Sequence, residues 1–63
     1  MQADELRDLR KGLGMGQQEL ADAIGMSRKL VSEMERSAAP IERRTALAVR
    51  YVALMGELNR PLD

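Results

Sequence analysis

The sequence lacks the residue types that most enzymes and metal proteins use. Its 63 residues include no cysteine, histidine, phenylalanine or tryptophan. Without cysteine there is no disulfide, thiol nucleophile or thiolate metal site, and without histidine the usual general base and zinc ligand are missing. No glycine-rich loop follows a strand pattern, and no serine has a base partner. We therefore expect no enzymatic activity, no cofactor and no bound metal.

Long apolar runs are missing as well. The first ten residues, MQADELRDLR, are charged throughout, and no apolar run approaches the length of a membrane span. Together with the lack of cysteine, this composition predicts a soluble cytoplasmic protein that does not contact membranes. A chain of this length has room for one domain, which we expect to span residues 1–63.

The shortage of aromatic residues limits what the core can be made of. Tyr51 is the only aromatic side chain, so Leu, Ile, Val, Met and Ala must fill the interior. Many short aliphatic side chains without aromatics or β-branched runs favour helices over strands. The composition therefore predicts an all-α fold.

The spacing of apolar residues predicts four helices, and glycines and polar residues predict where they end. Gly14 and Gly25 are suited to left-handed helix ends, and Ser27 is suited to the N-cap of the third helix. Asn59, Arg60 and Pro61 end the last one. The expected helices span residues 3 to 12 or 13, 17–24, 28–36, and 42 or 43 to 58.

A formal net charge of zero conceals an uneven distribution of charge. Residues 1–27 carry a net charge of −2, whereas residues 28–50 carry six basic and three acidic side chains. Within the third helix, Leu30, Val31 and Met34 fall on one side and most of the charge falls on the other. The apolar side must pack on the second helix, so the basic side must point outward.

Residues 17–36, QQELADAIGMSRKLVSEMER, contain a small Ala21 at the fifth position and Gly25 at the ninth. This stretch resembles the helix-turn-helix of the Cro/repressor-like, or XRE, family, and the wider resemblance covers about residues 6–51. It implies a compact, lambda-repressor-like DNA-binding fold of four helices, or of five as in many members of the family. The third helix would lie in the DNA major groove. The buried positions that the resemblance implies are Leu20, Ile24, Val31 and Met34.

The resemblance also implies which side chains contact DNA. Arg28 or Lys29 is the expected base reader, because Arg pairs bidentately with guanine, although a solvated helix face is the ordinary alternative. Glu33 either accepts a hydrogen bond from cytosine or holds Lys29 in place, and the sequence leaves both interpretations open. Apart from the resemblance, Arg36 and two arginines at the start of the fourth helix are interpreted as phosphate contacts, with a solvated surface as the alternative. The full set of expected DNA-binding residues is Gln17, Ser27, Arg28, Lys29, Ser32, Glu33, Arg36, Arg43 and Arg44.

The end of the third helix departs from the family pattern, whereas a pair of charged residues follows it. Members usually end the third helix with Gly or Asn-Gly, whereas this chain has Arg36-Ser37. Arg10 lies at the edge of the apolar stripe of the first helix, and Glu35 lies beside the apolar face of the third. The family often joins these two positions by an ion pair, and we expect the same pair here as a structural element.

The fourth helix has an apolar arc of about 160°, wider than the roughly 100° that packing on one core requires. We therefore expect a homodimer, whose two-fold pairing predicts an inverted-repeat operator in double-stranded DNA. The family resemblance implies that this dimer acts as a repressor. The alternative is an antitoxin or small phage-type adaptor, whose fourth helix binds another protein and whose DNA binding is autoregulatory. The expected dimer-interface residues are Leu47, Tyr51, Val52, Leu54, Met55 and Leu58.

Overall fold

The described part of the chain folds into four helices. The computed structural model describes residues 1–59, and within that range it contains no strand. The helices are α1 (Ala3–Gly12), α2 (Gln17–Ile24), α3 (Arg28–Glu35) and α4 (Arg43–Leu58). Each begins and ends within one residue of its predicted bounds, and the predicted all-α class is confirmed. Arg60 and Pro61, expected to end the last helix, lie outside the described residues.

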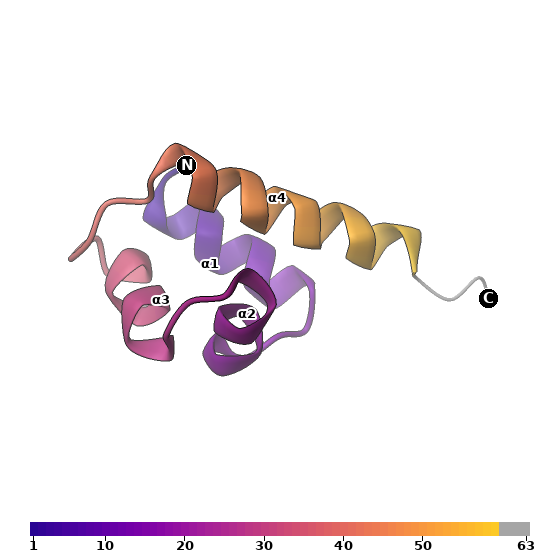
Figure 1. The fold of residues 1–63 in the computed structure, drawn as a ribbon, viewed down its shortest axis with the longest axis horizontal. Helices are drawn as coiled ribbons and strands as arrows, with labels where there is room; N and C mark the ends of the chain where they lie inside the picture. Colours follow the sequence, from indigo (N-terminus) through magenta and orange to yellow (C-terminus); the bar gives the residue numbers. More distant parts are fainter. Residues whose placement is uncertain (60–63) are drawn as a thin grey trace.

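The helices form two layers (Figure 1). α1 and α4 lie against each other in one layer, and α2 and α3, which pack most extensively on each other, form the second. The C-terminal part of α4 extends beyond the other three helices, which makes the molecule elongated. This arrangement leaves one side of α3 and one side of α4 without a helix packed on it.

The core receives side chains from every helix. Ala21, whose small size lets α2 and α3 approach each other closely, is completely buried. Ile24 is only partly buried, contrary to its predicted core position, because it lies in the last turn of α2 at the edge of the core. The buried apolar cluster consists of Leu6, Leu20, Ala21, Val31, Met34 and Val49.

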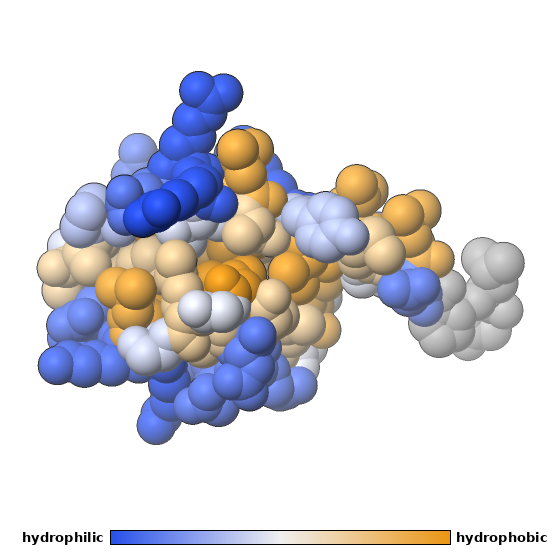
Figure 2. Space-filling view, viewed as in Figure 1, coloured by the Kyte–Doolittle hydropathy of each residue, from blue (hydrophilic) through white to orange (hydrophobic). Residues whose placement is uncertain are grey.

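α4 has two faces of different character. Thr45, Ala46 and Val49 point inward and are at most 6 % exposed. The opposite face is apolar yet open to solvent, with exposures of 54 % for Leu47 and 64 % for Tyr51. Figure 2 shows apolar side chains gathered on the projecting part of this helix. The exposed large apolar side chains are Leu47, Tyr51, Leu54, Met55 and Leu58; Val52, which was predicted with them, is partly buried.

The first three helices end in the same way, with one residue of left-handed backbone. In each case the residue that follows the left-handed one donates its N–H to a carbonyl five positions earlier. This hydrogen bond satisfies backbone groups that have no partner within the helix. The left-handed residues, with their φ angles, are Gly14 (70°), Gly25 (71°) and Ser37 (59°). Ser37 occupies the position where the family usually has glycine. The helix therefore ends in the same left-handed turn, but in a residue whose Cβ makes that backbone conformation strained.

Candidate nucleic-acid interface

The turn between α2 and α3 fixes the angle between these helices. Gly25 adopts left-handed backbone, and the N–H of Met26 donates to the carbonyl of Ala21 at 2.8 Å. Two residues later the Ser27 hydroxyl accepts a hydrogen bond from the N–H of Leu30 at 3.1 Å and so caps α3. The chain therefore leaves α2 and enters α3 within three residues, as a helix-turn-helix requires.

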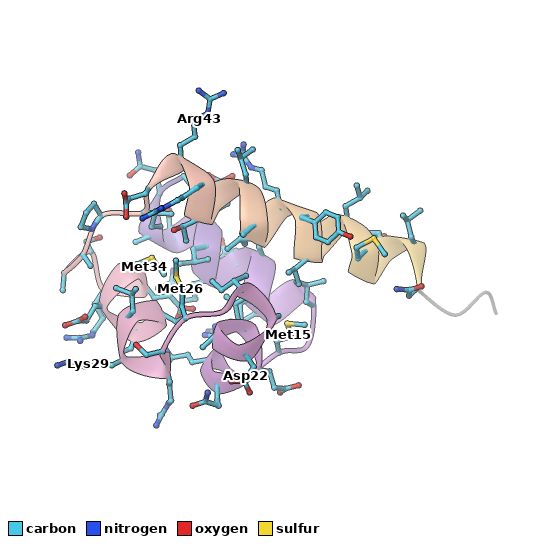
Figure 3. All side chains as sticks on the ribbon, viewed as in Figure 1. Met15, Asp22, Met26, Lys29, Met34 and Arg43 are labelled. Atoms are coloured by element: carbon cyan, nitrogen blue, oxygen red, sulfur yellow. The ribbon has the colours of Figure 1, made fainter. Side chains whose placement is uncertain are left out.

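α3 has one buried face and one exposed face. Val31 and Met34 are buried in the core, whereas Arg28, Lys29 and Arg36 are exposed. In Figure 3 the side chain of Met34 lies inside the molecule and that of Lys29 points away from it. The outer face of α3 is therefore basic, as the sequence predicted.

α2 contributes to the same surface. A hollow of about 420 Å³ lies along α3, and its lining has three cationic side chains and no carboxylate. Such a lining attracts a polyanion, because charges of one sign in a concave surface reinforce one another. The lining residues are Gln17, Arg28, Lys29, Ser32 and Arg36, which are five of the nine predicted DNA-binding residues.

Gln17 has a hydrogen-bond partner that the sequence did not reveal. Its side-chain N–H₂ donates to a carboxylate oxygen of Glu35 at 3.2 Å. The amide nitrogen carries a second hydrogen and the amide oxygen can accept, so the side chain keeps the capacity for further hydrogen bonds. Glu35 therefore orients a side chain that lines the hollow. The two residues are 18 positions apart, and no local spacing rule connects residues at that separation.

The ion pair predicted between α1 and α3 is present. Arg10 donates from Nε to Glu35 Oε2 at 2.6 Å and from Nη2 to Oε1 at 3.0 Å, in a bidentate arrangement. Its Nη1 donates to the carbonyl of Met15 at 2.9 Å, which ties the loop after α1 to the pair. The two side chains are only 12 % and 5 % exposed. The pair therefore links α1, α3 and the start of α2 through a largely buried network.

The surroundings of this pair shift both pKa values. Burial acts to raise the pKa of the Glu35 carboxyl, but hydrogen bonds from Arg10 and Gln17 and the charge of Arg10 outweigh it, so the pKa lies below its ordinary value. The hydrogen bond to Glu35 raises the pKa of Arg10. Both groups are therefore held in their charged forms.

Two other predicted contacts, Ser27 and Glu33, do not line the hollow but are sequence neighbours of residues that do. The Ser27 oxygen already accepts a bond from the Leu30 N–H, so its hydroxyl hydrogen is what it can offer a ligand. Glu33 is partly buried and forms no ion pair with Lys29 within the described part of the chain. The structural alternative for Glu33, that it holds Lys29 in place, is therefore not realised.

The two arginines at the start of α4 lie apart from this group. Both are exposed, and Arg44 lies 3.9 Å from the carboxylate of Glu42. In Figure 3, Arg43 points away from the molecule on a different side from Lys29. The structure thus does not bring these two residues to the hollow, and a phosphate contact by either one stays a prediction.

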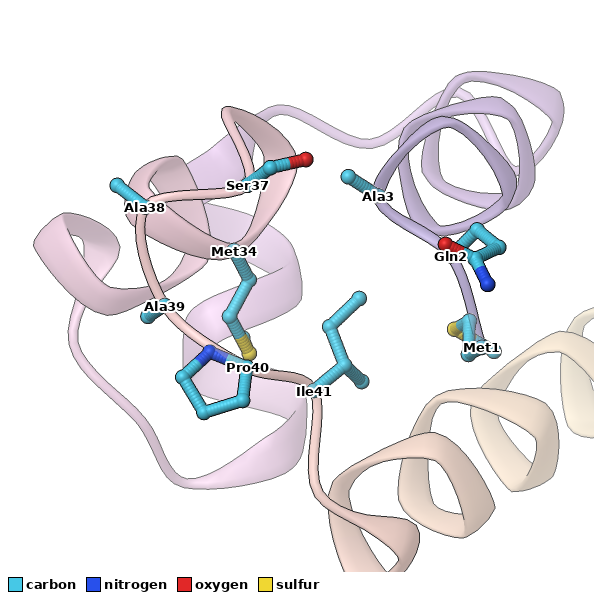
Figure 4. A pocket seen from close by; sticks show the side chains of 9 residues that line it. All are labelled: Met1, Gln2, Ala3, Met34, Ser37, Ala38, Ala39, Pro40 and Ile41. Atoms are coloured by element: carbon cyan, nitrogen blue, oxygen red, sulfur yellow. The ribbon is translucent and has the colours of Figure 1, made fainter.

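A second hollow, of about 380 Å³, lies between the N-terminal residues and the loop that joins α3 to α4 (Figure 4). Met34, Pro40 and Ile41 contribute to its lining, which has no charged side chain. It shares no lining residue with the hollow along α3 and does not belong to the basic surface.

Comparison with known proteins agrees with this geometry. The chain matches the helix-turn-helix domain family over residues 3–60, and it belongs to that family. This makes it a DNA-binding protein of the helix-turn-helix class, as the resemblance to Cro/repressor-like proteins predicted. No curated protein and no solved structure matches the chain significantly. Within the described residues, no helix is long and apolar enough to cross a membrane.

Proposed function

We propose that the protein is a sequence-specific transcriptional regulator of the Cro/repressor-like class, acting as a repressor with α3 in the DNA major groove. The observation that carries this proposal is the hollow in which Gln17 of α2 joins the exposed cations of α3. α2 would lie across the sugar-phosphate backbone and place α3 in the groove. This function requires no catalytic step and no cofactor.

The side chains divide by the contacts they can make. Arg28 and Lys29, in the first turn of α3, are the proposed base readers, because the N-terminal residues of a recognition helix reach base edges. A bidentate pair between Arg28 and guanine contributes about 1–3 kcal/mol of discrimination. Arg36 and Gln17 are proposed phosphate contacts, which position the protein without reading sequence.

The protein is proposed to bind as a homodimer. Five large apolar side chains of α4 are exposed, and a second copy would cover them. Two-fold pairing that places the recognition helices about 34 Å apart predicts an operator that is an inverted repeat.

The second candidate, an antitoxin or phage-type adaptor, uses the same α4 surface to bind a different protein. Analytical ultracentrifugation of the purified chain at micromolar concentration separates the two candidates. A dimer supports the repressor proposal, and a monomer at this concentration favours the adaptor.

The experiment that tests DNA recognition is selection of bound duplexes from a random pool, repeated with Arg28→Ala and Lys29→Ala. A base reader relaxes specificity at one position when it is replaced, whereas a phosphate contact weakens all sequences similarly. Lys11→Ala, an exposed cation of α1 outside the hollow, is the control and should enrich the same sequences as the unmodified protein. If no sequence is enriched over the random pool at moderate salt, the proposal fails.

A further inference from the structure

The exposed side of α4 carries a regular pattern that specifies how a second copy would bind. Its most exposed apolar residues recur at intervals of four, three and four, the spacing of the seam positions of a two-stranded coiled coil. Each is more than half exposed, whereas Val49 on the opposite side is completely buried. The seam residues are Leu47, Tyr51, Leu54 and Leu58.

The residues that flank this seam differ between its two sides. Advancing 100° per residue, Ala48 and Met55 fall on one flank, and Arg50 and Glu57 fall on the other. One flank is therefore apolar, and the other carries one positive and one negative charge seven residues apart. In coiled coils, charges at such flanking positions set partner choice and orientation.

We infer that two copies of the chain pair through α4 in antiparallel orientation. This inference rests on the proposed homodimer and specifies its interface. Tyr51 packs against Leu54 of the partner subunit, and Leu47 packs against Leu58 of the partner subunit. Two-fold symmetry repeats each contact, so every seam residue of both copies has an apolar partner.

Charge complementarity selects this orientation over the parallel one. In the antiparallel pair, Arg50 faces Glu57 of the partner subunit on one flank, and Ala48 faces Met55 of the partner subunit on the other. In a parallel pair, Arg50 would face Met55 of the partner subunit, so charge would meet an apolar side chain. Arg50 lies 3.4 Å from Glu5 of its own chain, and its guanidinium has five N–H donors, so it can serve both carboxylates.

A charge-reversal cycle tests the orientation by sedimentation equilibrium. Arg50→Glu and Glu57→Arg should each weaken the dimer by about 10-fold or more, since each creates two like-charge contacts in a symmetric pair. The double variant Arg50→Glu/Glu57→Arg should restore most of the affinity. Glu5→Gln removes only the contact within one chain, so it is the matched control and should leave the dimer unchanged.

Cross-linking gives a second readout of the same geometry. Because the chain has no cysteine, single cysteines can be placed at will. A mixture of Leu47→Cys and Leu58→Cys chains should form a disulfide-linked heterodimer on oxidation. Leu58→Cys alone should not form a linked dimer, because the two copies of residue 58 lie about 16 Å apart along antiparallel helices. Each variant alters an exposed residue, and circular dichroism checks that it folds.

The possible failures are distinguishable. A monomeric unmodified chain overturns the homodimer proposal together with this inference. A dimer in which Leu58→Cys cross-links to itself, or in which the double charge reversal restores nothing, overturns the antiparallel pairing and leaves the homodimer standing.

Discussion

At the scale of single residues, the hydrogen-bond network around Glu35 is the feature on which the stability of the fold most clearly depends. Its carboxylate accepts hydrogen bonds from Arg10 and Gln17, and it is almost completely buried. Removing one partner of a buried pair is costly because the other charge stays buried without compensation. The same carboxylate therefore stabilises the fold through Arg10 and holds the side chain of Gln17 in the hollow.

Replacement of Arg10 should therefore destabilise the protein strongly. We expect Arg10→Ala to cost about 3 kcal/mol, which lowers the Tm of so small a domain by at least about 12 °C. The Tm of Arg10→Lys, which keeps the charge without the bidentate geometry, should lie between the Tm of the unmodified protein and that of Arg10→Ala. Lys11→Ala, in the same helix but exposed, should change the Tm little. Calorimetry checks the series, and an unchanged Tm for Arg10→Ala rules out a stabilising pair.

The lowered pKa of Glu35 makes part of the stability dependent on pH. Because the folded pKa lies below the ordinary value, this contribution is present above that value and is lost as the pH falls through the folded pKa. We expect the stability gap between the unmodified protein and Glu35→Gln to be largest at neutral pH and to narrow below about pH 4. Urea unfolding from neutral to strongly acidic pH measures the difference in stability between the two proteins. A difference that stays constant across this range contradicts a lowered pKa of Glu35.

The left-handed residues at the helix ends give a pair of opposite predictions. Ser37→Gly should stabilise the protein by about 0.5–1 kcal/mol, because it relieves left-handed strain at some cost in chain entropy. Gly25→Ala should destabilise it by about 1–2 kcal/mol, because it introduces the same strain. Urea unfolding at neutral pH measures both. Equal effects of the same sign would contradict this description of the two turns.

At the scale of elements, α3 should bind DNA with phosphate contacts that can be counted. Arg36→Ala should weaken binding to all duplexes by a similar factor. It should also lower the magnitude of the slope of log K against log salt by about 0.9 for each phosphate that the variant no longer neutralises. Fluorescence anisotropy at several salt concentrations measures the slope. Weaker binding to one sequence alone would instead make Arg36 a base reader.

The helices and their ends were predictable from the sequence because the signals are local. The cap at Ser27 and the turn at Gly25 follow from side chains within a few positions. The inward face of α4 was not predictable, because Thr45 and Val49 are buried by packing on other helices. The contact between Gln17 and Glu35 was missed for the same reason, since it depends on how α2 and α3 lie together.

At the scale of the whole molecule, the fold leaves two surfaces for two proposed partners. The outer face of α3 is basic and suits DNA, and the exposed face of α4 is apolar and suits a second copy. If pairing through α4 places both α3 helices on one side of the dimer, a half-site duplex should bind at least about 10-fold more weakly than the full inverted repeat. Anisotropy with the two duplexes checks this expectation, and equal affinities contradict it.

The most direct test of the central claim is to map the DNA-contacting surface by NMR. Titration of ¹⁵N-labelled protein with a selected duplex should shift the amide signals of Gln17 and of residues 27–36. The signals of residues 3–9, in the first two turns of α1, should move little. Perturbations confined to α1 or α4, or no perturbation at all, would contradict the assignment of α3 as the recognition helix.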